Sequence, residues 1–199
     1  MSGTGHPSVV LLAHGSPDPR HAAGIDALAD LVRQRHCGPV HTAFLDHHAP
    51  KVGDVAAVLP PGRPVVLIPV LLSQGYHWRV DLPNAAASLG PDVTITEVLD
   101  DPEALAEAAL DVAAAHGWTG AVVLIDDQGR HRVVRPGLPG APVGAVARTL
   151  CAGVLADRAL EQAVAAGLTP IPGELARTQA VAGLVVQRIT GNAVGARSG

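Results

Sequence analysis

The sequence predicts an α/β protein of two flavodoxin-like (Rossmann-like) lobes with parallel sheets, the second lobe being shortened. The first observation is that short apolar runs alternate with amphipathic stripes, joined by short connections, up to residue 117. The second is that a similar but shorter series starts again at residue 121. The third is the composition, 48% hydrophobic and 16% charged, which can fill a core in each lobe. We expect one lobe at residues 1–117 and the other at residues 118–199.

Four strands and four helices alternate in the first lobe. The first strand is wholly apolar, as is typical of a parallel strand buried on both faces. Pro69 stands inside the third strand and should cause a bulge or end the strand, because proline donates no ladder hydrogen bond. Pro83 is expected in the first turn of the third helix, and Gly117 should end the fourth. The expected strands are Val9–Ala13, Val40–Asp46, Val65–Leu72 and Val93–Leu99, and the expected helices are 22–32, 50–59, 81–89 and 102–116.

The second lobe has fewer elements. Strands are expected at 121–125 and 143–150 and helices at 156–166 and 178–189, with a Gly- and Pro-rich stretch at 135–142. It therefore lacks about one helix–strand–helix unit after its opening strand. Its last helix carries an apolar stripe, formed by Val181, Leu184, Val185 and Ile189. We expect this lobe to cover the cleft in place of the partner subunit of a single-lobe homodimer, so that the protein is a monomer with an internal pseudo-dimer.

Charge, aromatic content and cysteine spacing exclude several classes of protein. The net charge is −4 and aromatic residues make up 2%, which argues against nucleic acid as a partner. Cys37 and Cys151 are too few and too far apart for a disulfide framework or a zinc knuckle. The apolar run at residues 9–13 follows no basic segment and is too short for a signal peptide or a membrane span. We expect a cytoplasmic protein with no membrane partner.

Two histidines follow the ends of expected strands. His14 directly follows the first strand, and His77 follows the third within Ser73-Gln74-Gly75-Tyr76-His77. In a flavodoxin-like strand order these two strands are neighbours, and open α/β sheets bind ligands beyond the carboxyl ends of their strands. Imidazole binds Fe²⁺, Co²⁺ and Ni²⁺ and accepts protons near neutral pH. The two histidines either share a cleft or are two separate surface loop residues.

Three motifs carry a resemblance to a known family. They are Leu11-Leu12-Ala13-His14-Gly15-Ser16-x-Asp18-Pro19-Arg20, then Ala43-Phe44-Leu45-Asp46 followed by Pro50, then Pro69-x-Leu71-Leu72-x-x-Gly75-Tyr76-His77-x-x-x-Asp81-x-Pro83. In this order, over about residues 8–117, the chain resembles the class II tetrapyrrole chelatases of the CbiX and SirB type. The resemblance implies insertion of Co²⁺ or Fe²⁺ into sirohydrochlorin or a related tetrapyrrole, in sirohaem or cobalamin biosynthesis. It also implies that His14 and His77 are the catalytic and metal-binding residues.

Metal insertion requires a loosely held ion and the removal of two pyrrole protons. Two imidazoles leave the ion open to ring nitrogens, so the divalent metal (Co²⁺, Fe²⁺ or Ni²⁺) is a substrate, and no organic cofactor is expected. Asp46 stands where the family commonly carries Glu, and its shorter side chain could weaken a role as metal ligand or proton relay. The adjacent His47 and His48 are either solvated loop residues or a metal-delivery cluster with at most one ring in the cleft. Asp46 and His47 are retained as further site candidates.

The tetrapyrrole of this family is rimmed with carboxylates, which arginine binds through two parallel hydrogen bonds. Arg20 and Arg79 follow the two histidine motifs, and they are either carboxylate clamps or solvated side chains. Ser16 either binds a substrate carboxylate or caps the following helix, and capping is favoured. Tyr76 belongs to the third motif and is a further candidate for substrate binding.

The second lobe carries none of these imidazoles. Asp126 and Asp127 stand where the first lobe has His14 and Gly15, and they are expected to be solvated or capping residues. A single site in the first lobe follows. Two alternative functions remain, a non-catalytic metal-binding or delivery protein and a regulatory homologue that binds a tetrapyrrole without inserting metal. A serine hydrolase is disfavoured, since no Gly-x-Ser-x-Gly elbow is present.

Overall fold

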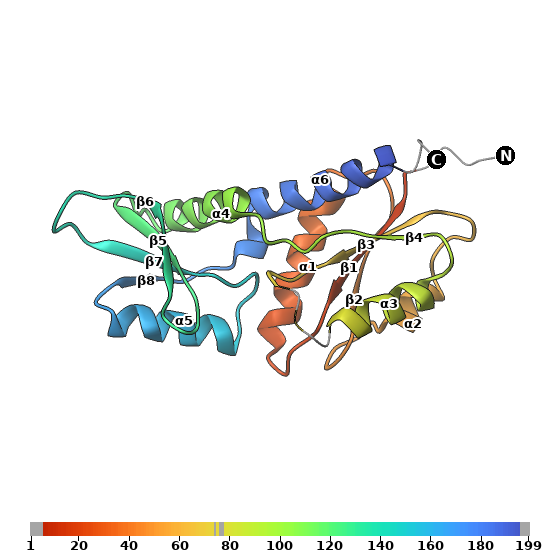
Figure 1. The fold of residues 1–199 in the computed structure, drawn as a ribbon, viewed down its shortest axis with the longest axis horizontal. Helices are drawn as coiled ribbons and strands as arrows, with labels where there is room; N and C mark the ends of the chain where they lie inside the picture. The colour runs from red at the N-terminus through yellow and green to blue at the C-terminus, as the bar shows by residue number, and fades with distance from the viewer. Residues whose placement is uncertain (1–5, 74, 76–77, 196–199) are drawn as a thin grey trace. The chain divides into compact units, whose positions relative to one another are not determined.

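The structure is a computed structural model of the chain, and it describes residues 6–73, 75 and 78–195. The chain divides into two compact units, the first made of residues 1–100 and 182–199 and the second of residues 101–181. In the described part, each unit contains one four-stranded sheet (Figure 1). The α/β fold expected from the sequence is therefore confirmed, with two sheets in which parallel pairs dominate.

The sheet of the first unit is fully parallel, with the strand order β2-β1-β3-β4. Its strands are β1 (Ser8–Ala13), β2 (Val40–Phe44), β3 (Val65–Pro69) and β4 (Val93–Ile95), and its helices are α1 (Pro19–Arg33), α2 (Val52–Ala56) and α3 (Trp78–Leu89). β1 is buried along its whole length, as its unbroken apolar run predicted. This order confirms that β1 and β3 are neighbours. β3 ends at Pro69, which is one of the two outcomes expected of this proline, and it stops short of the expected end at Leu72.

Alternating side chains distribute the core of the first unit over both faces of its sheet. Val10 and Leu12 of β1 and Leu67 of β3 pack with Val55 of α2 and Ala85 of α3. The other face is covered by α1, whose buried residues recur at helical spacing: Ile25, Leu28, Ala29 and Val32. The sheet is therefore covered by helices on both faces, and a ligand is expected beyond the carboxyl ends of its strands.

The second unit has the strand order β6-β5-β7-β8. Its strands are β5 (Ala121–Ile125), β6 (His131–Arg135), β7 (Val143–Ala147) and β8 (Thr169–Ile171), and its helices are α4 (Pro102–Ala115), α5 (Val154–Ala165) and the short 3₁₀ helix η1 (Leu175–Arg177). α5 packs Ala156, Ala159 and Ala163 on one face of the sheet, against Val123 and Ile125 of β5. The small alanine side chains let this helix approach the strands closely.

One strand of the second unit departs from the prediction of parallel sheets. β6 pairs antiparallel with β5, in the place that β2 occupies beside β1 in the first sheet. A parallel strand would need a crossover of a dozen or more residues, whereas residues 126–130 make a tight turn with Gly129 at a φ of 78°. A hairpin thus replaces the helix–strand–helix unit that this lobe lacks. β6 and β8 were not expected from the sequence.

The units divide the chain differently from the expected lobes. The expected boundary at residue 117 lies inside the second unit, because α4 packs on β5, β6 and β7. The last helix, α6 (Gln179–Gly195), begins in the second unit and ends in the first. Its buried Leu184, Val185 and Ile189 therefore belong to the first unit, although the sequence had assigned this stripe to the second lobe.

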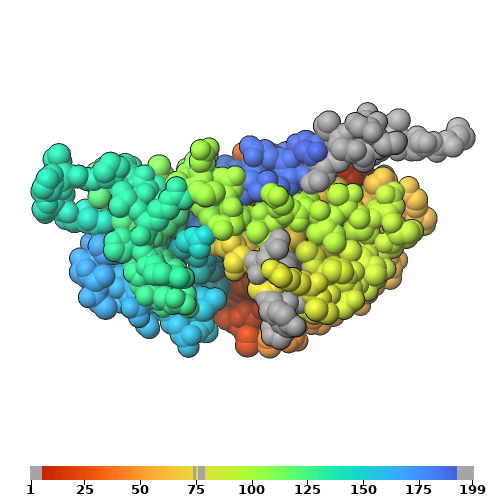
Figure 2. Space-filling view, viewed as in Figure 1, coloured from red at the N-terminus to blue at the C-terminus, as the bar shows by residue number. Residues whose placement is uncertain are grey.

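Smaller differences concern the ends of the elements. α3 begins at Trp78, so Pro83 lies in its second turn rather than its first. β4 ends at Ile95, well before the expected end at Leu99. In Figure 2 the segment between β6 and β7 stands out from the surface of the second unit, and Leu138 within it is 81% exposed. Among the described residues, no helix is both long and apolar enough to cross a bilayer.

Candidate functional site

The candidate site starts at the carboxyl end of β1. His14 is the first residue after this strand, and it is exposed. The loop after β2 runs beside it, because the Leu45 N–H donates to the Ala13 carbonyl (3.1 Å) and the Asp46 N–H donates to the His14 carbonyl (2.8 Å). These two bonds extend the pairing of β1 and β2 beyond the strands, and they bring Asp46 and His14 to the same end of the sheet.

Gly15 is required for this close approach of the two loops. Its φ of 96° is a conformation that side chains with a Cβ rarely adopt. A Cβ placed there would overlap the Asp46 carbonyl oxygen and lie 2.9 Å from the carbonyl carbon. The glycine in the motif therefore has a local structural reason, which is to let the loop after β1 pass against the loop after β2.

Asp46 and His47 form an exposed pair on the loop after β2. The Asp46 carboxylate accepts the His47 N–H (2.8 Å) and lies 3.5 Å from the His47 Nε2. The backbone hydrogen bond from His47 is the main factor that lowers the pKa of Asp46, and electrostatic interactions with His47, Lys51 and His14 add to it. His47 itself has a φ of 60°, a left-handed conformation that is uncommon for residues other than glycine. Two side chains of the kind that bind divalent metals therefore lie on the loop whose backbone is hydrogen-bonded to His14.

His48 behaves differently from its neighbour. Its ring lies edge-on to Phe44, with ring centroids 5.3 Å apart, and the residue is half-buried. Its Nε2 is buried and has no hydrogen-bond partner in the part of the chain that the structure describes. Of the adjacent histidines only His47 is exposed, so His48 is not the solvated loop residue that the sequence suggested.

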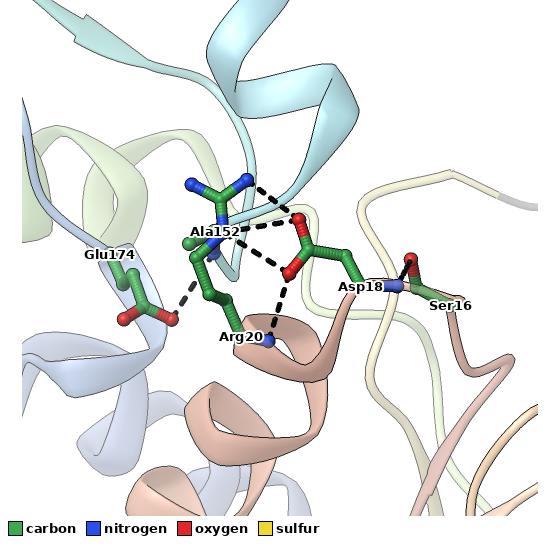
Figure 3. A network of polar contacts seen from close by, with 5 residues as sticks. All are labelled: Ser16, Asp18, Arg20, Ala152 and Glu174. Carbon is green, nitrogen blue, oxygen red and sulfur yellow. Dashed lines mark hydrogen bonds and ion pairs between the residues drawn. The ribbon is translucent and has the colours of Figure 1, made fainter.

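The loop before α1 positions Arg20. Asp18 is the N-cap of this helix and accepts the Arg20 N–H (2.9 Å), while Pro19 occupies the first turn. Ser16 instead accepts the Asp18 N–H (3.2 Å), so the predicted capping role of Ser16 is wrong (Figure 3). Sequence reasoning overlooked Asp18, although an acid directly before a proline at a helix start is a recognised N-cap signal.

Arg20 is engaged with this same carboxylate. Its Nε lies 3.1 and 3.0 Å from the two Asp18 oxygens, and its Nη2 lies 2.6 Å from Oδ2 (Figure 3). The hydrogen bonds from the Arg20 side chain and backbone hold the pKa of Asp18 below its usual range. The Arg20 guanidinium therefore binds the Asp18 carboxylate in the geometry expected of a carboxylate clamp. The second candidate, Arg79, is an exposed residue in the first turn of α3.

Two predicted site residues, Tyr76 and His77, lie outside the described residues. The spatial relation of His77 to His14 is therefore an expectation that rests on the adjacency of β1 and β3. Within the ranges that the structure describes, no group of three or more His, Cys, Asp or Glu side chains is arranged to hold a metal ion.

The corresponding loop of the second unit has a structural role. Asp126 follows β5 as His14 follows β1, and its carboxylate accepts hydrogen bonds from the Gln128 N–H (3.0 Å), the Arg130 N–H (2.9 Å) and the Arg130 Nε (2.7 Å). Its side chain is only 15% exposed, so it closes the β5–β6 turn rather than being solvated. Burial raises the pKa of Asp126, but the hydrogen bonds from Arg130 and Gln128 outweigh it and the pKa is lowered.

Glu174 is a second internal tie of this unit. One of its carboxylate oxygens accepts the Ala152 N–H (3.1 Å; Figure 3). The other accepts a hydrogen bond from the Arg177 Nε (2.6 Å). The neighbouring Cys151 is buried, which together with the charge of Glu174 raises the pKa of its thiol to about 12. These groups stabilise the loop between β7 and α5, and they offer no exposed nucleophile or metal ligand.

Comparison with known proteins assigns the family. The model of the CbiX family matches residues 8–115, which is more than half of the chain and includes every predicted site residue. The chain belongs to the CbiX family. No curated protein sequence matches it.

Solved structures resemble this CbiX-family chain over nearly its whole length. SirB from Bacillus subtilis with Fe³⁺ has a TM-score of 0.70 at 14% identity, covering 96% of each chain. The sirohydrochlorin chelatase SirB from Bacillus subtilis subspecies spizizenii, in complex with cobalt, has a TM-score of 0.66 at 15% identity, covering 95% of this chain and 96% of that one. A CbiX described as the terminal enzyme of siroheme biosynthesis in denitrifying bacteria has a TM-score of 0.53 at 17% identity, covering 93% and 98%. At these identities the likeness establishes the fold of both units of the CbiX-family chain.

Proposed function

We propose that this CbiX-family chain is a chelatase that inserts a divalent metal ion, Co²⁺ or Fe²⁺, into sirohydrochlorin or a related tetrapyrrole. The observation that carries the proposal is the exposed His14 at the carboxyl end of β1, bonded through its backbone to the Asp46 loop and lying inside the family match. The metal ions named for the two SirB structures, Fe³⁺ and cobalt, support an ion of this kind as the substrate.

His14 and His77 are proposed to hold the ion and to accept the pyrrole protons. Imidazole is a ligand of intermediate softness and a base near neutral pH, so one residue type serves both steps. The lowered pKa of Asp46 keeps its carboxylate negative on the loop that is bonded to His14, where it favours a cation and orients His47. Few fixed ligands suit an ion that must leave the protein for the ring nitrogens.

Substrate binding is proposed to use Ser16, Arg20, Tyr76 and Arg79. Arg20 already shows the bidentate geometry with Asp18 that a substrate carboxylate would require. Arg79 is exposed and therefore accessible to a second carboxylate. The Ser16 hydroxyl accepts one backbone hydrogen bond and retains its own proton to donate to an anion.

A metal-delivery protein is the second candidate function, and the exposed Asp46–His47 pair favours it. Such a protein would bind Co²⁺ or Fe²⁺ on this loop but would not accelerate its entry into a tetrapyrrole. A regulatory homologue would bind the tetrapyrrole with the same absence of turnover. The rate of insertion thus separates both alternatives from the chelatase.

The test is an absorbance assay of metal insertion into sirohydrochlorin, measured against the spontaneous rate. We expect acceleration by the wild-type chain and a loss of about 10²-fold or more in His14→Ala and in His77→Ala, the usual scale for a lost acid–base group. His131→Ala, which removes an exposed imidazole from β6, is the matched control and should insert metal at the wild-type rate. Insertion at the spontaneous rate by the wild type, or full activity of His14→Ala, would contradict the proposal.

The oligomeric state and location are part of the same proposal. We infer that the chain acts in the cytoplasm as a monomer, with one site in the N-terminal lobe and the second lobe in place of a partner subunit. The repetition of one strand order, β2-β1-β3-β4 and β6-β5-β7-β8, supports an internal pseudo-dimer. Light scattering should give a mass near that of a single 20.2 kDa chain.

A further inference from the structure

The starting observation is that the carboxylate-binding face of Arg20 is already engaged. Nε and Nη2 point at the two oxygens of Asp18, at distances of 2.6–3.1 Å (Figure 3). Arginine uses this same pair of nitrogens to bind carboxylates side-on. A carboxylate that approaches Arg20 therefore meets donors that Asp18 occupies.

The Asp18 side chain is more constrained than the Arg20 side chain. Asp18 is anchored, since its carboxylate also caps α1 by accepting the Arg20 N–H, and its side chain is only 15% exposed. The Arg20 side chain is 51% exposed. Because ion pairs with an exposed partner are weak, the guanidinium can exchange one carboxylate for another at small free-energy cost. Asp18 would keep its backbone hydrogen bond during this exchange and remain close to the incoming anion.

We propose that Asp18 is a built-in competitor for the Arg20 guanidinium and thereby limits how tightly the site holds a carboxylate-bearing tetrapyrrole. The inference rests on the proposed function, because it takes Arg20 as a substrate clamp. Metal insertion leaves the peripheral carboxylates of the ring unchanged, so the competitor weakens substrate and product alike. Asp18 acts through Arg20, as a positioning residue that lowers the affinity for both ligands and so shortens the time for which the metallated product stays bound.

Asp18→Asn is the decisive variant. Asparagine caps helices about as well as aspartate, so α1 should retain its cap while the competing charge is removed. We expect the Kd for metal-free sirohydrochlorin, from an absorbance titration at low salt, to fall about two- to fivefold, the range set by ion pairs with an exposed partner. The gain should shrink at 0.5 M salt, because added ions screen the interaction.

Asp30→Asn provides the matched control. Asp30 pairs with Arg33 at 2.7 Å on the same helix, so this variant removes an equal charge and a similar ion pair at the opposite end of α1. Its Kd should stay at the wild-type value. In an Arg20→Ala background, where binding is weaker, Asp18→Asn should give no gain. A merely structural role of Asp18 would not depend on Arg20.

Three results would overturn the inference: an unchanged Kd in Asp18→Asn, a higher Kd in Asp18→Asn, or a gain in affinity from Asp18→Asn that persists in the Arg20→Ala background. A higher Kd would mean that Asp18 orients Arg20 for the substrate instead of competing with the substrate carboxylate. A wild-type chain that inserts metal while Asp18→Asn binds normally refutes this inference alone. A wild-type chain that neither binds nor metallates the tetrapyrrole overturns the proposed function as well.

Discussion

Replacing Gly15 by alanine should separate the loop after β1 from the loop after β2. At a φ of 96° an L-residue is disfavoured, by about 1–2 kcal/mol on the scale of left-handed backbone. The new Cβ would also overlap the Asp46 carbonyl oxygen. Relief of that overlap requires the two hydrogen bonds between these loops to lengthen or break, at about 0.5–1.5 kcal/mol each. We expect Gly15→Ala to destabilise the protein by about 2–5 kcal/mol.

Gly62→Ala is the control that isolates the overlap. Gly62 has a φ of 70° in the same unit, and nothing lies within 4 Å of a Cβ placed there. Its substitution should therefore incur only the backbone term, about 1–2 kcal/mol. Urea unfolding followed by circular dichroism, with both variants and the wild type at one temperature, measures the difference.

Metal insertion gives the second readout of the same pair of variants. Displacement of a catalytic group by about 1 Å can lower the rate by about 10²-fold. Gly15→Ala should lose insertion on that scale, since His14 and Asp46 no longer meet, whereas Gly62→Ala should insert metal normally. Equal destabilisation of the two variants, with insertion intact in both, would refute the reasoning that Gly15 joins these loops.

Two further predictions concern the second unit. Asp126→Ala should leave metal insertion unchanged but destabilise the protein by about 1–3 kcal/mol at pH 7, because the β5–β6 turn loses its acceptor. Since the folded pKa of Asp126 is lowered, its contribution to stability is complete above the unfolded value near 3.8 and is lost as the pH falls through the folded pKa. The difference in urea midpoint between variant and wild type should therefore be constant at neutral pH and narrow progressively as the pH is lowered below 3.8, and a gap that does not narrow would contradict this. The second prediction concerns the thiols: a pKa of about 12 leaves about one in 10⁵ Cys151 side chains ionised at pH 7. A maleimide should therefore label the exposed Cys37 in the folded protein and reach the buried Cys151 only after unfolding. Rapid labelling of both cysteines in the folded protein, detected by mass spectrometry, would contradict this prediction.

Strands that are buried on both faces were the most predictable elements. The apolar runs of β1, β3 and β5 stand out because a parallel strand covered by helices has no solvent face to carry polar residues. β6 and β8 were missed for the converse reason. β6 lies at a sheet edge with three exposed residues, and β8 is three residues long and contains Pro170, so neither has an apolar pattern to detect.

The sequence by itself determined the buried strands β1, β3 and β5, the interruption at Pro69 and the motif residues that surround His14, because each depends on local pattern and spacing. The strand order of the first sheet followed from the flavodoxin-like fold that this pattern predicts. Only the tertiary structure decided the hairpin of β6, the division of α6 between the two units, and the choice of Asp18 rather than Ser16 as the N-cap of α1. Only it revealed that Asp18 engages Arg20 and that Gly15 lies against Asp46. These features depend on contacts whose directions are set when the chain packs, and a linear pattern of apolar and polar residues does not record such directions.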